Sequence, residues 1–121
     1  MLVADDTLLN RFILEKALGK QGARITHASD GLEVVECLRA NANDYDAVLM
    51  DVQMPGMDGL EATRLIRTEL GLTNLPIIAL SGGVMPEEKQ AAIDAGMNEF
   101  MNKPVELDKL ITIVCQYCKK P

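Results

Sequence analysis

Five side chains that could take part in chemistry lie where short apolar runs of the sequence end. They are an aspartate pair, a single aspartate, a serine and a lysine: Asp5, Asp6, Asp51, Ser81 and Lys103. Three carboxylates in one cleft repel each other and attract a cation. Mg²⁺ suits such a set, because it prefers oxygen ligands and typically uses one or two carboxylates together with a phosphate. The pattern therefore predicts a Mg²⁺ site that binds a phosphoryl group.

Asp51 is the candidate nucleophile of this set. The only histidine, His27, falls on a different predicted strand, and no cysteine ends a strand at this edge. A carboxylate can itself form a covalent aspartyl phosphate. The Lys103 ammonium can pair with a phosphoryl oxygen or a carboxylate, and the Ser81 hydroxyl can donate to a phosphoryl oxygen. These residue types indicate metal-dependent phosphoryl transfer to Asp51.

The residues around Asp51 predict how its carboxylate is positioned. Residues 47–50 are a continuous apolar run, too short for an ordinary helix, which predicts a parallel strand buried on both faces. Residues 54–56 favour a turn, and Asp58 with Glu61 has the spacing of a helix N-cap and its capping-box partner. An aspartate at a strand end can also serve only to begin a turn, so Asp51 alone leaves both interpretations open.

Five predicted strands alternate with five predicted helices along the chain. The strands are expected at residues 1–4, 23–28, 47–50, 76–80 and 99–101, and the helices at 8–20, 31–40, 59–70, 86–95 and 106–118. This alternation is typical of a parallel sheet with helices on both faces. We therefore expect an α/β, flavodoxin-like (βα)5 three-layer sandwich with strand order 2-1-3-4-5. In that order the five side chains meet at the carboxyl edge of the sheet, where such folds bind ligands.

The apolar faces of the first and last helices are predicted from their periodicity. In the first helix the inward residues are expected to be Leu9, Phe12, Ile13 and Ala17. In the last helix they are expected to be Leu107, Leu110, Ile111, Val114, Cys115 and Cys118. The two cysteines form a C-x-x-C motif. A zinc site would need a second pair of ligands, which is missing, and a redox motif would be expected at the start of a helix rather than near its end. We therefore expect both cysteines to serve in packing.

Size and composition exclude several classes of protein. A chain of 121 residues suits one packed domain, and a net charge of −6 argues against direct nucleic-acid binding. No apolar run has the length of a membrane span and no signal peptide precedes the first strand, so we expect no membrane insertion and a cytoplasmic location. Because the first strand is short, we also expect the natural domain to begin earlier, within a longer protein.

The whole chain resembles the receiver domain of two-component response regulators. The resemblance rests on four motifs in order and at normal spacing: L-V-A-D-D, L-M-D-V-Q-M-P-G-M-D-G, I-I-A-L-S and N-K-P. A finer similarity, carried by Asn10-Arg11 and by A-G-M-N-E-F-M-N-K-P-V, is to receivers of hybrid sensor histidine kinases. The chain departs from that subgroup at Thr7, where Asn is common, and at Ser81-Gly82, where Thr-Ala is common. Serine keeps the hydroxyl, so we expect function to survive.

The resemblance implies a phosphoacceptor and a metal site. Asp51 would accept a phosphoryl group from the phosphohistidine of a histidine kinase or a histidine phosphotransfer domain. Asp6 and Asp51 would bind Mg²⁺, or Mn²⁺ in its place, joined by the backbone carbonyl of Gln53. Asp5 would act on the ion through water. As an isolated domain, the chain is expected only to phosphorylate and dephosphorylate itself.

The resemblance also implies a switch. Ser81 and Lys103 would hold the phosphoryl oxygens, and the peptide between Lys103 and Pro104 would be cis, an isomer that costs little only before proline. Movement of Ser81 would couple to the ring of Phe100, shifting the face made by the fourth helix, fifth strand and fifth helix. The sparse apolar surface of the fourth helix would permit a weak homodimer.

Three other functions compete with this one. A hydrolase of the haloacid dehalogenase type has its nucleophile in a D-x-D motif after the first strand, whereas here Asp5 and Asp6 are adjacent and no cap insertion follows. A degenerate receiver would act only as an interaction module, yet all five site residues are intact. A flavodoxin-like nucleotide binder needs a Gly- or Ser/Thr-rich phosphate loop after the first strand. This chain has Asp5 and Asp6 there instead, and this pair would repel a phosphate.

Overall fold

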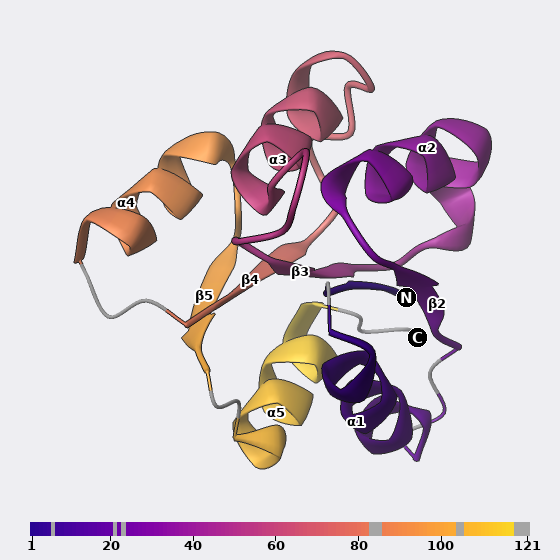
Figure 1. The fold of residues 1–121 in the computed structure, drawn as a ribbon. Coiled ribbons are helices and arrows are strands. Elements are labelled where there is room, and N and C mark those ends of the chain that lie inside the picture. Colours follow the sequence, from indigo (N-terminus) through magenta and orange to yellow (C-terminus); the bar gives the residue numbers. More distant parts are fainter. Residues whose placement is uncertain (6, 21, 23, 83–85, 104–105, 118–121) are drawn as a thin grey trace.

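Five parallel strands form one sheet in the order β2-β1-β3-β4-β5, as predicted (Figure 1). The computed structural model describes residues 1–5, 7–20, 22, 24–82, 86–103 and 106–117. The strands are β1 (Leu2–Ala4), β2 (Thr26–Ala28), β3 (Val48–Asp51), β4 (Ile77–Ser81) and β5 (Glu99–Asn102). The order places β1 beside β3, so the predicted switch point lies between these two strands.

Helices cover both faces of the sheet (Figure 1). One face carries α1 (Leu8–Gly19) and α5 (Leu107–Tyr117). The other carries α2 (Gly31–Asn41), α3 (Gly59–Thr68) and α4 (Pro86–Ala95), and a short 3₁₀ helix, Ala42–Asp44, follows α2. The predicted three-layer sandwich is confirmed. None of the helices described here is long and apolar enough to cross a membrane.

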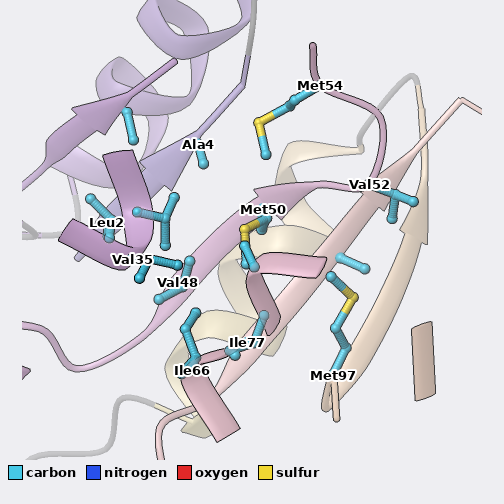
Figure 2. Close-up of a cluster of buried hydrophobic side chains, with 14 of the residues drawn as sticks. Leu2, Ala4, Val35, Val48, Met50, Val52, Met54, Ile66, Ile77 and Met97 are labelled. Atoms are coloured by element: carbon cyan, nitrogen blue, oxygen red, sulfur yellow. The ribbon is translucent and has the colours of Figure 1, made fainter. Parts of the chain in front are cut away.

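The sheet has a hydrophobic core on each side. Successive strand residues point to opposite faces. Val48 and Met50 therefore pack beneath α2, α3 and α4, whereas Leu49 packs beneath α1 and α5. Figure 2 shows the first of these cores, where Ile66 of α3 and Ile77 of β4 lie among the strand side chains. Burial on both faces explains why β3 is a continuous apolar run.

Each strand differs by a residue or more from the prediction at one end at least, and the second and fourth strands differ most informatively. The second strand was expected at residues 23–28, but β2 covers only Thr26–Ala28, and Ala23 lies outside the described residues. Its pattern is weak because Thr26 and His27 are exposed at the sheet edge, so burial does not select apolar side chains there. The fourth strand extends one residue further than expected, so Ser81 is itself part of β4.

The predicted inward face of α1 is wrong. Leu14 and Leu18 face the sheet, whereas 64% of Leu9 and 42% of Ile13 are exposed. Apolar residues occur nearly all round this helix, so periodicity alone did not define one stripe, and packing against the sheet and α5 selected the buried pair. Phe12 is exposed as well.

The predicted stripe of α5 is partly right. Leu110 and Val114 are buried and Ile111 is partly buried, but Leu107 is exposed. Cys115 is also exposed, so the expectation that it packs in the stripe is wrong. Ile113 and Tyr117 are instead partly buried against this core, so the face of α5 that meets the sheet is rotated away from Leu107 and Cys115. Cys118 lies outside the described residues.

A tight connection joins the end of β3 to the start of α3. Asp58 caps the helix, since its Oδ1 accepts from the Glu61 backbone N–H at 2.9 Å. The backbone N–H of Gly59 donates to the Val52 carbonyl at 3.0 Å. A Cβ atom on Gly59 would overlap the backbone oxygen of Asp51. Glycine is therefore required here by the close approach of helix and strand end.

We expect Gly59→Ala to lower the free energy of unfolding by about 2 kcal/mol, because the methyl group would push the α3 backbone away from the Asp51 carbonyl. Gly19→Ala is the matched control, since a Cβ there meets no heavy atom within 4 Å. That helical substitution should be neutral or stabilise by about 0.5 kcal/mol. Urea unfolding of both variants measures the difference, and equal effects would contradict the close-approach argument.

Candidate functional site

A lysine holds two buried aspartates together at the carboxyl edge of the sheet. Lys103 Nζ lies 2.6 Å from Asp51 Oδ2 and 3.1 Å from Asp5 Oδ2. Asp5 directly follows β1, Asp51 ends β3, and Lys103 directly follows β5. Because β4 lies between β3 and β5, the long lysine stem must span a strand to reach the carboxylates. The structure thus brings together three of the five predicted side chains.

Backbone and side-chain donors orient both carboxylates. Asp5 Oδ1 accepts from the Thr7 backbone N–H at 2.8 Å, and Asp5 Oδ2 accepts from Asn10 Nδ2 at 3.4 Å. Asp51 Oδ1 accepts from the Gln53 backbone N–H at 3.1 Å. The oxygen atoms of both aspartates therefore have defined partners, which fixes the direction in which Asp51 presents its carboxylate.

Burial and charge act against each other in this cluster. Asp5 is fully buried and Asp51 nearly so, whereas a quarter of the Lys103 side chain is exposed. Burial raises the pKa of Asp51 above its ordinary value, although hydrogen bonds from Lys103 and the Gln53 N–H act to lower it. Burial acts to lower the pKa of Lys103, but its bonds to the two carboxylates outweigh this effect and raise that pKa. Lys103 therefore remains a cation, and the ionised form of Asp51 carries a free-energy cost.

Ser81 lies at the same edge, on the strand next to Asp51. The register pairs Asp51 with Leu80, so Ser81 is one residue further along β4. Its hydroxyl donates to Glu88 Oε1 of α4 at 2.9 Å, and its carbonyl accepts from the Lys103 backbone N–H at 2.7 Å. Ser81 is thus linked both to the lysine segment and to α4.

The remaining predicted residues are placed as follows. Phe100 lies on β5 opposite Ala79, is partly buried, and packs against the core beneath α2, α3 and α4. Gln53 lies in the loop after β3, where it bonds Asp51 through its backbone and Glu88 through its side chain. Asp6, predicted as a metal ligand, and Pro104, predicted in a cis peptide, lie outside the described residues.

The donor set at this edge suits a hard cation. In the described part of the chain, no group of three or more His, Cys, Asp or Glu side chains is placed to hold a metal ion. The oxygen donors that the described contacts bring together here are the carboxylates of Asp51 and Asp5, which share Lys103. Mg²⁺ typically takes one or two carboxylates and completes its shell with water and phosphate oxygens. The residues present fit that chemistry.

The sequence did not reveal three partners in the site. The Thr7 N–H and the Asn10 amide orient Asp5, and Glu88 accepts from Ser81. Asn10 was noticed only as part of a family motif, without a role. Glu88 carried no signal, because its contact with Ser81 depends on how α4 packs at the end of β4.

Comparison with known proteins identifies the family. The model of the response regulator receiver domain matches residues 1–115 of the chain. The chain belongs to the response regulator receiver family. The predicted resemblance is thereby confirmed, and the haloacid dehalogenase alternative is not favoured.

Relatives of this receiver domain are parts of sensor kinases. It is 40% identical over 120 residues to the sensor histidine kinase RcsC of Salmonella typhi, covering 99% of this chain and 12% of RcsC. It is 36% identical over 122 residues to the osmosensing histidine protein kinase SLN1 of Saccharomyces cerevisiae, covering 98% of this chain and 10% of SLN1. The receiver domain thus spans about a tenth of the length of these relatives.

A solved receiver domain has the same fold. The receiver domain of the sensor histidine kinase PA1611 from Pseudomonas aeruginosa PAO1 superimposes with a TM-score of 0.86 at 33% identity, covering 98% of this chain and 96% of that one. That structure has a magnesium ion coordinated in its active-site cleft. The similarity to receivers of sensor histidine kinases therefore extends from sequence to structure.

We expect Asp51→Asn to raise the free energy of unfolding at pH 7 by roughly 1 kcal/mol, because the amide removes a buried charge and can still accept the Gln53 N–H. A raised pKa in the folded protein means that wild-type stability falls as pH rises above the carboxyl's ordinary value of 3.8. The advantage of the variant should therefore be small near pH 4 and grow toward pH 7.

Urea unfolding between pH 4 and pH 7 measures this trend. Asp44→Asn is the control, because Asp44 is exposed and precedes the amino end of β3. The burial argument would be contradicted by an Asp51→Asn variant that is less stable than wild type at pH 7.

Proposed function

We propose that this domain accepts a phosphoryl group on Asp51 from a phosphohistidine and relays a signal through the resulting change in shape. The observation that carries the proposal is the contact of one lysine with two buried aspartates at the carboxyl edge of the sheet. A buried nucleophile beside a fixed cation is suited to receiving an anionic group, since the cation offsets the charge that arrives.

The transfer needs little from the protein beyond positioning and charge. An oxygen of Asp51 attacks the phosphorus atom, and the bond between phosphorus and the histidine nitrogen breaks. The electron pair of that bond returns to the imidazole ring, and an aspartyl phosphate remains on the domain. Negative charge spreads over the phosphoryl oxygens during transfer. Lys103 pairs with one of these oxygens, and Ser81 donates to another.

Four residues of this chain would hold a magnesium ion. They are Asp51, Asp5 through water, the backbone carbonyl of Gln53, and Asp6. Mg²⁺ would neutralise charge on the transferred phosphoryl oxygens when bound. The oxygen donor set of this chain and the magnesium ion in the PA1611 receiver domain support this assignment. Mn²⁺ as a substitute stays a prediction.

We further propose that the 121 residues are one receiver domain within a longer hybrid sensor kinase, on its cytoplasmic side. The similarity to RcsC and SLN1, of which the domain covers about a tenth, supports this proposal. The donor would then be a histidine kinase or a histidine phosphotransfer domain. Phe100 and the face of α4, β5 and α5 would carry the output.

Incubation with a small acyl or amido phosphate should add one phosphoryl group to the wild-type protein in Mg²⁺, as measured by intact mass. The adduct should be absent with EDTA and in Asp51→Asn, and it should be labile to hydroxylamine. Asp44→Asn should be phosphorylated like the wild type. No adduct on wild type under any condition would favour a degenerate interaction module, and catalytic phosphate release without an adduct would favour a hydrolase.

An apolar surface beside the site supports a proposal for where the donor protein binds. A cavity of about 500 Å³ has Asp5 and Lys103 in its lining. Its wall includes Ile13 of α1 and Leu107 of α5, both of which are exposed. Lys103, which lines this cavity, bonds Asp51, so the cavity adjoins the phosphoacceptor. We therefore propose that the donor packs on the exposed apolar side of α1.

We expect Ile13→Glu to slow phosphoryl transfer from a phosphorylated histidine phosphotransfer domain by at least about tenfold, because a charge replaces apolar surface that the donor would bury. Phosphorylation by the small donor should not change. Leu32→Glu is the matched control, since 49% of Leu32 is exposed on α2, which lies on the other face of the sheet. Equal slowing by both variants would argue against a donor surface on α1.

A further inference from the structure

One carboxylate oxygen of α4 accepts hydrogen bonds from two segments of the site. Ser81 Oγ donates to Glu88 Oε1 at 2.9 Å, and Gln53 Nε2 donates to the same oxygen at 3.4 Å. Ser81 ends β4, Gln53 lies two residues after Asp51, and Glu88 is in the first turn of α4. This oxygen therefore connects the end of β4, the phosphoacceptor loop and the start of α4.

The bond to Glu88 competes with the expected role of Ser81. A serine hydroxyl has a single proton to donate. Here that proton is directed at a carboxylate, and such charge-assisted bonds are stronger than bonds between neutral groups. Ser81 lies one residue beyond the partner of Asp51 on the neighbouring strand, and in the proposed function its hydroxyl donates to the phosphoryl group on Asp51. Donation to that group therefore requires the bond to Glu88 to break.

We propose that Glu88 is a positioning residue for the phosphoryl site: it holds the Ser81 hydroxyl in the unphosphorylated protein and releases it on phosphorylation. The inference rests on the proposed phosphoryl transfer to Asp51. A phosphoryl group brings negative charge toward the Glu88 carboxylate, and the repulsion favours release. Until then, only the fraction of molecules with a released hydroxyl can bind the phosphoryl group fully, so the bond lowers the apparent affinity for it.

Substitution of Glu87 is the control that distinguishes this role of Glu88 from a general effect of charge on α4. Both glutamates lie in the first turn of the helix, where negative charge interacts favourably with the helix dipole. Glu87 is exposed, whereas Glu88 is partly buried and bonded to Ser81. Substituting either residue removes the same charge from the same helix end, but only substitution of Glu88 removes the acceptor of the Ser81 proton.

The test measures binding of beryllofluoride in the presence of Mg²⁺ to the whole domain by NMR titration. Beryllofluoride occupies the place of a phosphoryl group on an aspartate. Glu88→Ala should lower the dissociation constant by about fivefold, which is the size of effect expected from one hydrogen bond. Glu88→Gln should lower it less, because the amide oxygen still accepts. Glu87→Ala should leave it unchanged within a factor of about two.

A double-mutant cycle shows whether the effect passes through the hydroxyl. In a Ser81→Ala background no hydroxyl remains to be held, so Glu88→Ala should no longer change the dissociation constant. A general destabilisation of α4 would act equally in both backgrounds. The cycle therefore gives a result that a purely structural role for Glu88 would not produce.

The two phenylalanines of the chain supply a spectroscopic readout. Fluorophenylalanine labelling gives resonances for Phe12 and Phe100 only, and Phe12→Leu assigns them. Without ligand, Glu88→Ala should move the Phe100 resonance part of the way toward its position in the beryllofluoride complex. Glu87→Ala should not move it.

The inference is overturned if Glu88→Ala leaves the dissociation constant unchanged or raises it, if it acts equally in the Ser81→Ala background, or if Phe100 does not respond. If Glu88→Ala does not fold, Glu88→Gln against Glu87→Gln decides by the same criteria. A wild-type domain that does not bind beryllofluoride gives a different result, which overturns the proposed phosphoryl transfer together with the inference that rests on it.

Discussion

The structure depends on one lysine that balances two buried carboxylates. Asp5 and Asp51 are buried from water at the ends of neighbouring strands. Two like charges so close together would repel each other strongly. Lys103 offsets this repulsion, although it follows β5, two strands away from β3 and three from β1. One positive and two negative charges leave the cluster with an excess of negative charge, which favours the approach of a cation. The same lysine that links the two carboxylates therefore lies where the proposed metal ion and phosphoryl group would bind.

The elements around this cluster connect it to the surface through short, rigid contacts. Gly59 lets α3 start against the backbone of Asp51, and Asp58 caps that helix. The Glu88 carboxylate joins the same loop to Ser81 and α4. A change at Asp51 can thus reach α4 and β5 through hydrogen bonds that have a definite alternative partner, which is the condition for a two-state response. This gives the proposed switch a physical route that does not depend on large movements of the sheet.

The sheet was predictable because each buried strand is marked by a short apolar run in the sequence. Strands buried on both faces must be apolar throughout, and right-handed crossovers leave few ways to order them. Helix faces were harder to predict. In α1, Leu9 and Ile13 are as apolar as Leu14 and Leu18, and only contact with the sheet and α5 distinguishes the two pairs. Cys115 shows the same limit in α5, where periodicity placed it inward and the structure exposes it. Ile13 and Leu107 are exposed where they line the cavity beside the site. The proposed donor surface accounts for this exposure, because a bound donor would bury both side chains.

The sequence alone predicted that Asp5, Asp51 and Lys103 come together at the carboxyl edge of the sheet, and which strand ends carry them. Strand ends are marked by an abrupt change from apolar to polar residues, and the parallel order then brings those ends to one side. Tertiary structure decided which oxygen faces which donor: Lys103 between Asp5 and Asp51, Asn10 on Asp5, and Ser81 on Glu88. These pairings join residues from separate elements, so they follow from distances across the folded chain, which no local pattern in the sequence encodes.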